Sequence, residues 1–155
     1  MSAAVQEPAG LERLLGTVGD AMTGAAVLVA ADMPAEHALR RLDQQAVSGA
    51  PVVDRGRVVG VITRRDLLTP IPEQGSYESP LAGLRVCDLM STEPVTAGSD
   101  WPLVRAVREM VRHGVNRLPV VEATGRPVGV LTRDDVLRVL AAGDRGPPVP
   151  GPAQG

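Results

Sequence analysis

Lysine and phenylalanine are absent from this chain of 155 residues, and its only aromatic residues are Tyr77 and Trp101. So few aromatic rings exclude the stacking platform that proteins binding single-stranded nucleic acid use. The 16 basic residues, all of them arginine, are balanced by 18 acidic residues, so the charge does not favour a phosphate backbone either. We therefore expect no nucleic-acid partner and a core made of aliphatic side chains and methionine.

Metal ligands and catalytic motifs are equally scarce. Cys87 is the only cysteine, so no disulfide can form within the chain, and its spacing from His37 and His113 matches no zinc pattern. A Gly-x-Ser-x-Gly elbow, a Walker lysine and paired cysteines are all missing from the sequence. We predict a protein that is not an enzyme, binds no metal and requires no cofactor.

Long hydrophobic runs and targeting signals are also lacking. Residues 1–10 have neither a basic nor an apolar stretch of the kind found in signal peptides, and no run of 18 apolar residues follows. We expect a cytoplasmic protein without a membrane partner.

The most informative feature present is an internal repeat, because four segments occur twice at nearly constant spacing. Three pairs lie 68 positions apart, and the fourth lies 69 apart: VGDAMT at 18–23 with VCDLMS at 86–91, DMP at 32–34 with DWP at 100–102, PVVD at 51–54 with PVVE at 119–122, and GVITRRD at 60–66 with GVLTRDD at 129–135. One extra residue in a turn of the second copy explains the change in spacing.

Each copy predicts the order β-α-β-β-α, so we expect an α/β fold. The predicted strands are 26–29, 51–53 and 58–62 in the first copy and 95–97, 118–121 and 128–131 in the second. The predicted helices are 34–46 and 102–113, which begin at Asp-x-Pro and end near Gly49 and Gly114, and one more after each of Thr63 and Thr132. Neither copy would bury its sheet well alone, so the two repeats should pack sheet against sheet with pseudo-twofold symmetry.

Composition sets the expected boundaries of the two repeats. The first repeat is predicted at 11–69, with a short helix at 11–15, and the second at 84–142. Residues 70–83, rich in proline and glycine, should form the linker. Residues 1–10 are expected to be flexible, and the Pro- and Gly-rich tail at 143–155 is expected to be disordered.

The repeated segments resemble the cystathionine β-synthase (CBS) domain, which occurs in tandem pairs called Bateman modules. The resemblance extends over about 18–140 and rests on the opening Asp-x-Met-Thr/Ser, the Asp-x-Pro helix start, the Pro-Val-Val-acid strand and the closing Gly-x-x-Thr-x-x-Asp, each present twice. It implies a disc with adenosine-type ligands in clefts between the repeats, and a role in regulation rather than in catalysis.

The pairs Thr63/Asp66 and Thr132/Asp135 are the leading candidates for nucleotide binding. Each aspartate can accept hydrogen bonds from both ribose hydroxyls, and each threonine can donate to a phosphate beside free amides at a helix start. The same spacing is also close to a capping box, which stabilises a helix by about 1 kcal/mol without any ligand. Both interpretations stay open from the sequence.

The resemblance implies three further contacts. Arg117 matches a basic position that contacts ligand phosphates, and Val47 and Val115 match positions that contact the adenine ring. Core packing explains the valines equally well. Since Gly49 stands where the second repeat has Arg117, the two clefts cannot be equivalent, and we expect weak binding or binding at one site.

Several neighbouring residues have two interpretations. Arg64, Arg65 and Arg133 follow the motif threonines and either face a phosphate or are solvated surface residues. Trp101 either stacks on a purine or packs against the protein, whereas Met22 and Met90 are expected to fill the core.

These observations favour a stand-alone regulatory module that binds AMP, ADP, ATP or a related adenosyl compound. We expect a homodimer that signals through changed association with an unidentified protein partner. The alternatives are a ligand-free dimerisation or scaffold module and a detached regulatory subunit of an enzyme or transporter.

Overall fold

The computed structural model describes residues 15–24, 27–71 and 79–143, which form two similar halves. In chain order the elements are α2 (Val18–Ala21), β1 (Val29–Ala30), α3 (Ala35–Gln44), β2 (Gly49–Asp54), β3 (Arg57–Thr63), α4 (Arg64–Leu68), α5 (Val86–Leu89), β4 (Ser91–Thr92), α6 (Leu103–His113), β5 (Arg117–Val121), β6 (Pro127–Thr132) and α7 (Arg133–Gly143). The predicted flexible N-terminus, most of the helix at 11–15, half of the linker and nearly all of the tail lie outside the described residues.

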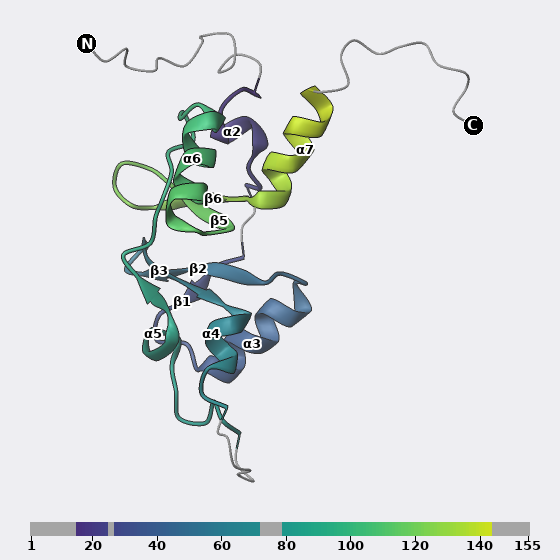
Figure 1. Ribbon diagram of the computed structural model, residues 1–155. Helices are drawn as coiled ribbons and strands as arrows, with labels where there is room; N and C mark the ends of the chain where they lie inside the picture. Colours follow the sequence, from purple (N-terminus) through teal and green to yellow (C-terminus); the bar gives the residue numbers. More distant parts are fainter. Residues whose placement is uncertain (1–14, 25–26, 72–78, 144–155) are drawn as a thin grey trace.

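The two halves meet through their sheets. One sheet has the strand order β1-β2-β3-β4, and the other pairs β5 with β6. Figure 1 shows both sheets in the middle of the molecule, with α3 and α4 on one side and α6 and α7 on the other. The mixed α/β fold with two repeats is as predicted.

The hairpin strands and the helices after them match the prediction closely, but three details are wrong. The strand predicted at 26–29 shares only Val29 with β1. The predicted strand at 95–97 is reduced to a parallel bridge between Ala97 and Val120. Gly49 does not end a helix, because it is the first residue of β2; the left-handed residue after α3 is Ala46, with φ 54°. Gly114 does terminate α6, with φ 63°.

The opening segment of each repeat packs on the other repeat. Val18 of α2 is fully buried among Leu103, Leu118 and other core residues of the second half. In the same way Val86 of α5 is fully buried in the core of the first half. Figure 1 shows α2 beside α6 and α7, and α5 in the half that contains β1 and α3. Each core is therefore completed by a segment from the other repeat.

The opening segments of the two repeats, which pack on the opposite halves, are called the exchanged segments. Glycine allows them to approach the sheets closely at two equivalent places. A Cβ on Gly60 of β3 would lie 2.5 Å from the Ser91 carbonyl oxygen, and one on Gly129 of β6 would lie 2.6 Å from that of Thr23. Both carbonyls belong to exchanged segments, since β4 pairs with β3 and Thr23 pairs with Val130. The glycine of the closing motif is thus required by packing, whatever its role toward a ligand.

Candidate functional site

Two clefts lie between the repeats and are related by the pseudo-twofold arrangement. The large cleft, of about 620 Å³, is lined by residues between 61 and 66 of the first repeat and by 91–95 and 113–117 of the second. The small cleft, of about 330 Å³, is lined by Thr23, Val27, 46–49 and the end of β6, which corresponds to the end of β3 in the large cleft. Ser48, Asn116 and Arg117 line both clefts.

Each threonine–aspartate pair forms a complete capping box. The Thr63 backbone N–H donates to Asp66 Oδ2 at 2.9 Å, and the Asp66 N–H donates to Thr63 Oγ1 at 3.2 Å. Thr132 and Asp135 have the same two bonds, at 2.9 and 3.2 Å. These bonds fix the side chains at the starts of α4 and α7. The free amides expected at these helix starts are mostly engaged, because the Arg64 and Arg133 N–H groups also donate to the Ser48 and Asn116 carbonyls at 2.9 and 2.8 Å.

The two aspartates differ in their access to a cleft. Asp66 is partly exposed and lines the large cleft together with Thr63. Asp135 is only 5% exposed, and the small cleft is lined by Asp134 in its place. Asp135 Oδ1 also accepts a hydrogen bond from Arg138 Nη1 at 3.1 Å. In the described part of the chain, Asp66 Oδ1 accepts no hydrogen bond from a protein group.

Arg117 lies between the two clefts. Its Nη2 donates to Ser48 Oγ of the other repeat, and a Cβ on Gly49 would lie 2.9 Å from its Nη1. The guanidinium thus fits because glycine occupies the equivalent position of the first repeat. Partial burial lowers the pKa of Arg117 below its ordinary value, and the group stays a cation at any physiological pH.

The neighbouring arginines are arranged unequally. Arg64 Nε donates to the Val47 carbonyl at 3.0 Å, and its Nη2 lies 3.9 Å from Asp43 Oδ1, so this side chain ties α4 to the end of α3. Arg65 is exposed and lines the large cleft, whereas Arg133 is exposed and lines the small one. His113, also at the large cleft, pairs with Glu109 at 3.2 Å.

Val47 and Val115 lie at the small and large clefts respectively. Both are partly buried, and each also packs against the hydrophobic core of its own half. The two interpretations of these valines are therefore compatible. Ser48 and Asn116, which line both clefts, are not predicted as site residues from the sequence. They occupy equivalent positions just before Gly49 and Arg117.

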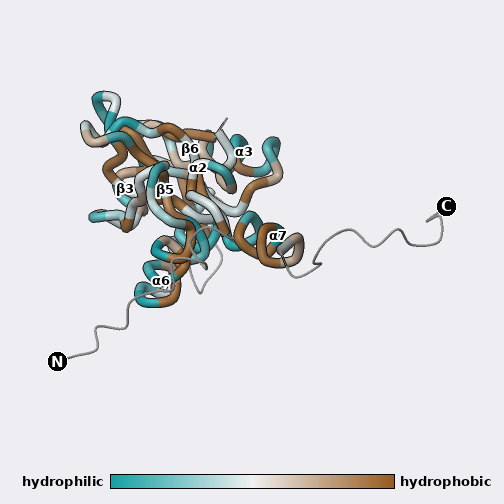
Figure 2. Tube along the Cα trace, turned by 90° about the horizontal axis from the view of Figure 1, so that it is seen from above, coloured by the Kyte–Doolittle hydropathy of each residue, from teal (hydrophilic) through white to brown (hydrophobic). Residues whose placement is uncertain are grey.

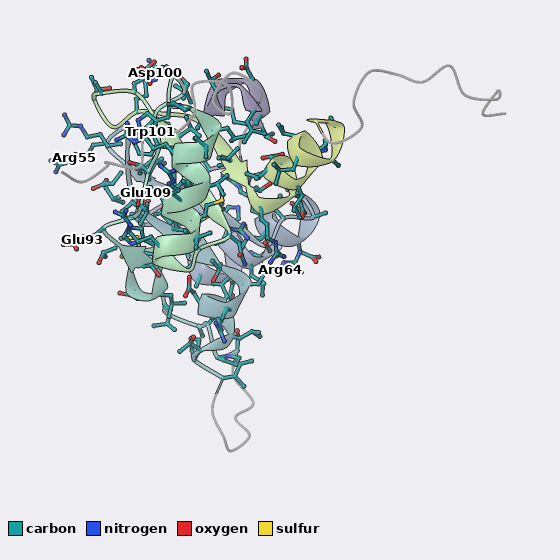
Figure 3. The ribbon with its side chains drawn as sticks, turned by 45° about the horizontal axis from the view of Figure 1, so that its top comes forward. Arg55, Arg64, Glu93, Asp100, Trp101 and Glu109 are labelled. Carbon is teal, nitrogen blue, oxygen red and sulfur yellow. The ribbon has the colours of Figure 1, made fainter. Side chains whose placement is uncertain are left out.

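Trp101 and the two methionines belong to the packed interior. Trp101 packs against the core of the second half, and Arg105 lies 3.7 Å above its ring. Figure 3 shows Trp101 close to Asp100 and well away from Arg64, and neither cleft is lined by it. Met22 and Met90 pack against the cores of the opposite halves, as expected for core residues but through the exchanged segments.

The described part of the chain offers neither a metal centre nor a membrane-spanning helix. Within 15–24, 27–71 and 79–143, no group of three or more His, Cys, Asp or Glu side chains could hold a metal ion. Over the same ranges, no helix has both the length and the hydrophobicity needed to cross a bilayer.

The family is established by sequence comparison. The model of the CBS domain matches twice, at residues 18–73 and 86–142, so the chain belongs to the CBS domain family as a tandem pair. CBS pairs are regulatory domains rather than catalytic ones. The match covers both exchanged segments and both capping boxes.

Known relatives place such pairs in several contexts. The chain is 32% identical over 111 residues, 72% of its length, to inosine-5'-monophosphate dehydrogenase of Korarchaeum cryptofilum, but spans only 21% of that enzyme. The CBS-pair protein CBSX2 of Arabidopsis thaliana is 32% identical, with a TM-score of 0.74 over 84% of this chain and 98% of that one.

Two solved relatives contain adenosyl ligands. CBSX2 has been crystallised in complex with AMP, at 31% identity and a TM-score of 0.71 over 81% of this chain and 97% of that one. The CBS pair of protein MJ0100, which is 23% identical with a TM-score of 0.70 over 82% and 97% of the two chains, contains 5'-methylthioadenosine and S-adenosyl-L-methionine. At that lower identity the likeness to MJ0100 concerns the fold alone.

Proposed function

We propose that this protein is a regulatory module that binds an adenosyl ligand, such as AMP, ADP or ATP, in its large cleft. Membership of the CBS family and the AMP complex of CBSX2 support the ligand class. The observation that carries the choice of cleft is the position of Asp66, which caps α4 with one carboxylate oxygen and still lines the large cleft.

Six of the residues that line the large cleft have side chains that suit a nucleotide. The Asp66 carboxylate accepts from the ribose hydroxyls, and the Thr63 hydroxyl is placed to donate to phosphate. Arg117 and Arg65 supply positive charge for the phosphate, and Val115 with Val61 offers an apolar wall for adenine. Both cleft volumes lie within the range of small-molecule sites, but the large cleft, at about 620 Å³, leaves more room for a nucleotide than the small one at about 330 Å³.

The output of such a module is a change in association. Exposed apolar residues gather on α6 and α7, where Val111 is 78% and Leu137 is 53% exposed, and they border an apolar groove between the two helices. Figure 2 shows hydrophobic residues along α7 and part of α6. We infer that this face joins two copies in a homodimer and that ligand binding alters how the dimer meets its protein partner.

A constitutive scaffold is the second candidate function. The capping boxes in both repeats favour it, because caps account for all four threonine and aspartate residues without a ligand. In that case dimerisation through α6 and α7 is the whole function.

A thermal-shift screen separates the two candidates. The purified protein is titrated with AMP, ADP, ATP, NAD and S-adenosylmethionine, and we expect a ligand-dependent rise in Tm because only the native state binds. Asp66→Ala should lose this rise, whereas Asp135→Ala should keep it. Both variants lose a cap worth about 1 kcal/mol, and Asp135→Ala also loses the bond from Arg138, so the Tm of each variant without ligand is the reference for its own ligand-dependent rise. No rise with any ligand would favour the scaffold.

The association surface is tested separately by sedimentation velocity. Val111→Asp combined with Leu137→Asp should convert the dimer into a monomer, because it places charge in a dry interface. Leu68→Asp, an equally exposed leucine on α4, is the matched control and should remain dimeric. Unchanged dimerisation in the double variant would contradict the assignment of this face.

A further inference from the structure

We propose that the residue three positions after the motif aspartate, Thr69 in the first repeat and Arg138 in the second, decides which cleft accepts the adenosyl ligand. The inference rests on the proposed function, because it concerns the aspartate that would hold the ribose. A side chain at this position can contact the carboxylate oxygen that makes no capping bond, and it thereby determines how many ligands the protein binds.

In the second repeat the carboxylate is engaged on both oxygens. Asp135 Oδ2 accepts from the Thr132 N–H at 2.9 Å, and Oδ1 accepts from Arg138 at 3.1 Å. The Asp135 side chain is 6% exposed, whereas Arg138 is 73% exposed and approaches from the solvent side of α7. The Asp135 carboxylate does not line the small cleft, so a ribose could reach it only by displacing Arg138 from Oδ1.

In the first repeat no such cation stands at the equivalent position. Thr69 follows Asp66 by three residues, as Arg138 follows Asp135, and its hydroxyl donates instead to the Arg65 carbonyl at 3.2 Å. Asp66 caps Thr63 through Oδ2 and lines the large cleft. The carboxylate therefore keeps one oxygen for a ligand at the cleft whose volume is the greater.

The ion pair and the burial of Asp135 both disfavour a ligand at the small cleft. An ion pair whose cation is 73% exposed is screened by solvent, so its displacement changes affinity by about 2- to 5-fold. The near-complete burial of the Asp135 carboxylate acts in the same direction. We therefore expect one adenosyl ligand per chain, in the large cleft, and we expect Arg138 to keep the small cleft empty at ligand concentrations that fill the large one.

Reciprocal exchange of the two residues tests this inference by isothermal titration of the full chain with AMP. Wild type should bind one AMP per chain. Thr69→Arg should weaken that site by about 2- to 5-fold, and Thr69→Gln, which is uncharged, should weaken it much less. Arg138→Thr should add a second, weaker site that Asp135→Ala removes, whereas Arg138→Lys, which keeps the cation, should bind one AMP.

The outcomes distinguish the two levels of the argument. Wild type that binds one AMP, with Thr69→Arg equal to Thr69→Gln and Arg138→Thr still at one site, would overturn the inference and leave the proposed function standing. Wild type that binds no AMP or other adenosyl compound would overturn both. Circular dichroism of each variant confirms that a lost site is not an unfolded protein.

Discussion

The backbone of Ala46 adopts a left-handed conformation that is unfavourable for a residue with a side chain. This residue ends α3 with φ 54°, and the equivalent residue at the end of α6 is Gly114, with φ 63°. Glycine adopts this left-handed conformation freely, whereas an L-residue with a Cβ is disfavoured by about 1–2 kcal/mol. The first repeat therefore stores strain at a place where the second has none.

Replacing Ala46 by glycine should relieve that strain. Since the loss of chain entropy offsets part of the gain, we expect Ala46→Gly to raise the free energy of unfolding by about 0.5–1 kcal/mol, measured by urea denaturation. Gly114→Ala is the matched control and should lower it by about 1 kcal/mol. A lower stability for Ala46→Gly would contradict the account.

At this scale the sequence indicates the site but not its asymmetry. Thr63 and Asp66 could be picked out because the motif occurs twice, and Arg117 because it matches a family position. Arg138 could not, because a single arginine on a helix usually means a solvated side chain. Gly49 is misread as a helix end because glycine also serves a second purpose, the close approach of a neighbouring side chain.

Among the elements, the hairpins and long helices are predictable, and the exchange of openings is not. Alternating valines and turn glycines specify β2, β3, β5 and β6 locally. The local sequence does not determine on which of the two sheets α2 packs, because both repeats present nearly the same surface. The strand predicted at 95–97 is wrong for a related reason: Val95 and Ala97 on either side of a β-branched threonine predict a strand, but only Ala97 has a bridging partner.

The exchange can be tested at Gly60. Gly60→Ala should lower the free energy of unfolding by about 1–3 kcal/mol, because the new methyl group meets the Ser91 carbonyl of β4 and the Met90 sulfur. Chemical denaturation followed by circular dichroism gives the value. Gly24→Ala, where an added Cβ meets nothing within 4 Å, should stay within about 0.5 kcal/mol of wild type. Equal effects of the two substitutions would argue against the close approach.

The molecule as a whole should survive cutting between its repeats. A protease site placed within 72–78 would cut the chain between α2 and the core that α2 completes. The two fragments should stay together, because Val18 remains buried in the second half and Val86 in the first. We expect the two fragments to elute together in size-exclusion chromatography and to separate only on denaturation. Fragments that separate without denaturant would show that the exchanged segments contribute little binding.

Because the cores are completed crosswise, a chain with a single repeat would need a second copy of itself to fold, with the opening segments swapped between the copies. In such a symmetric pair every substitution appears on both sides, so the two sites can never diverge. Joining the repeats in one polypeptide removes that restriction. Glycine in one repeat can then face arginine in the other between the two clefts. A substitution can change one repeat while the other keeps its sequence.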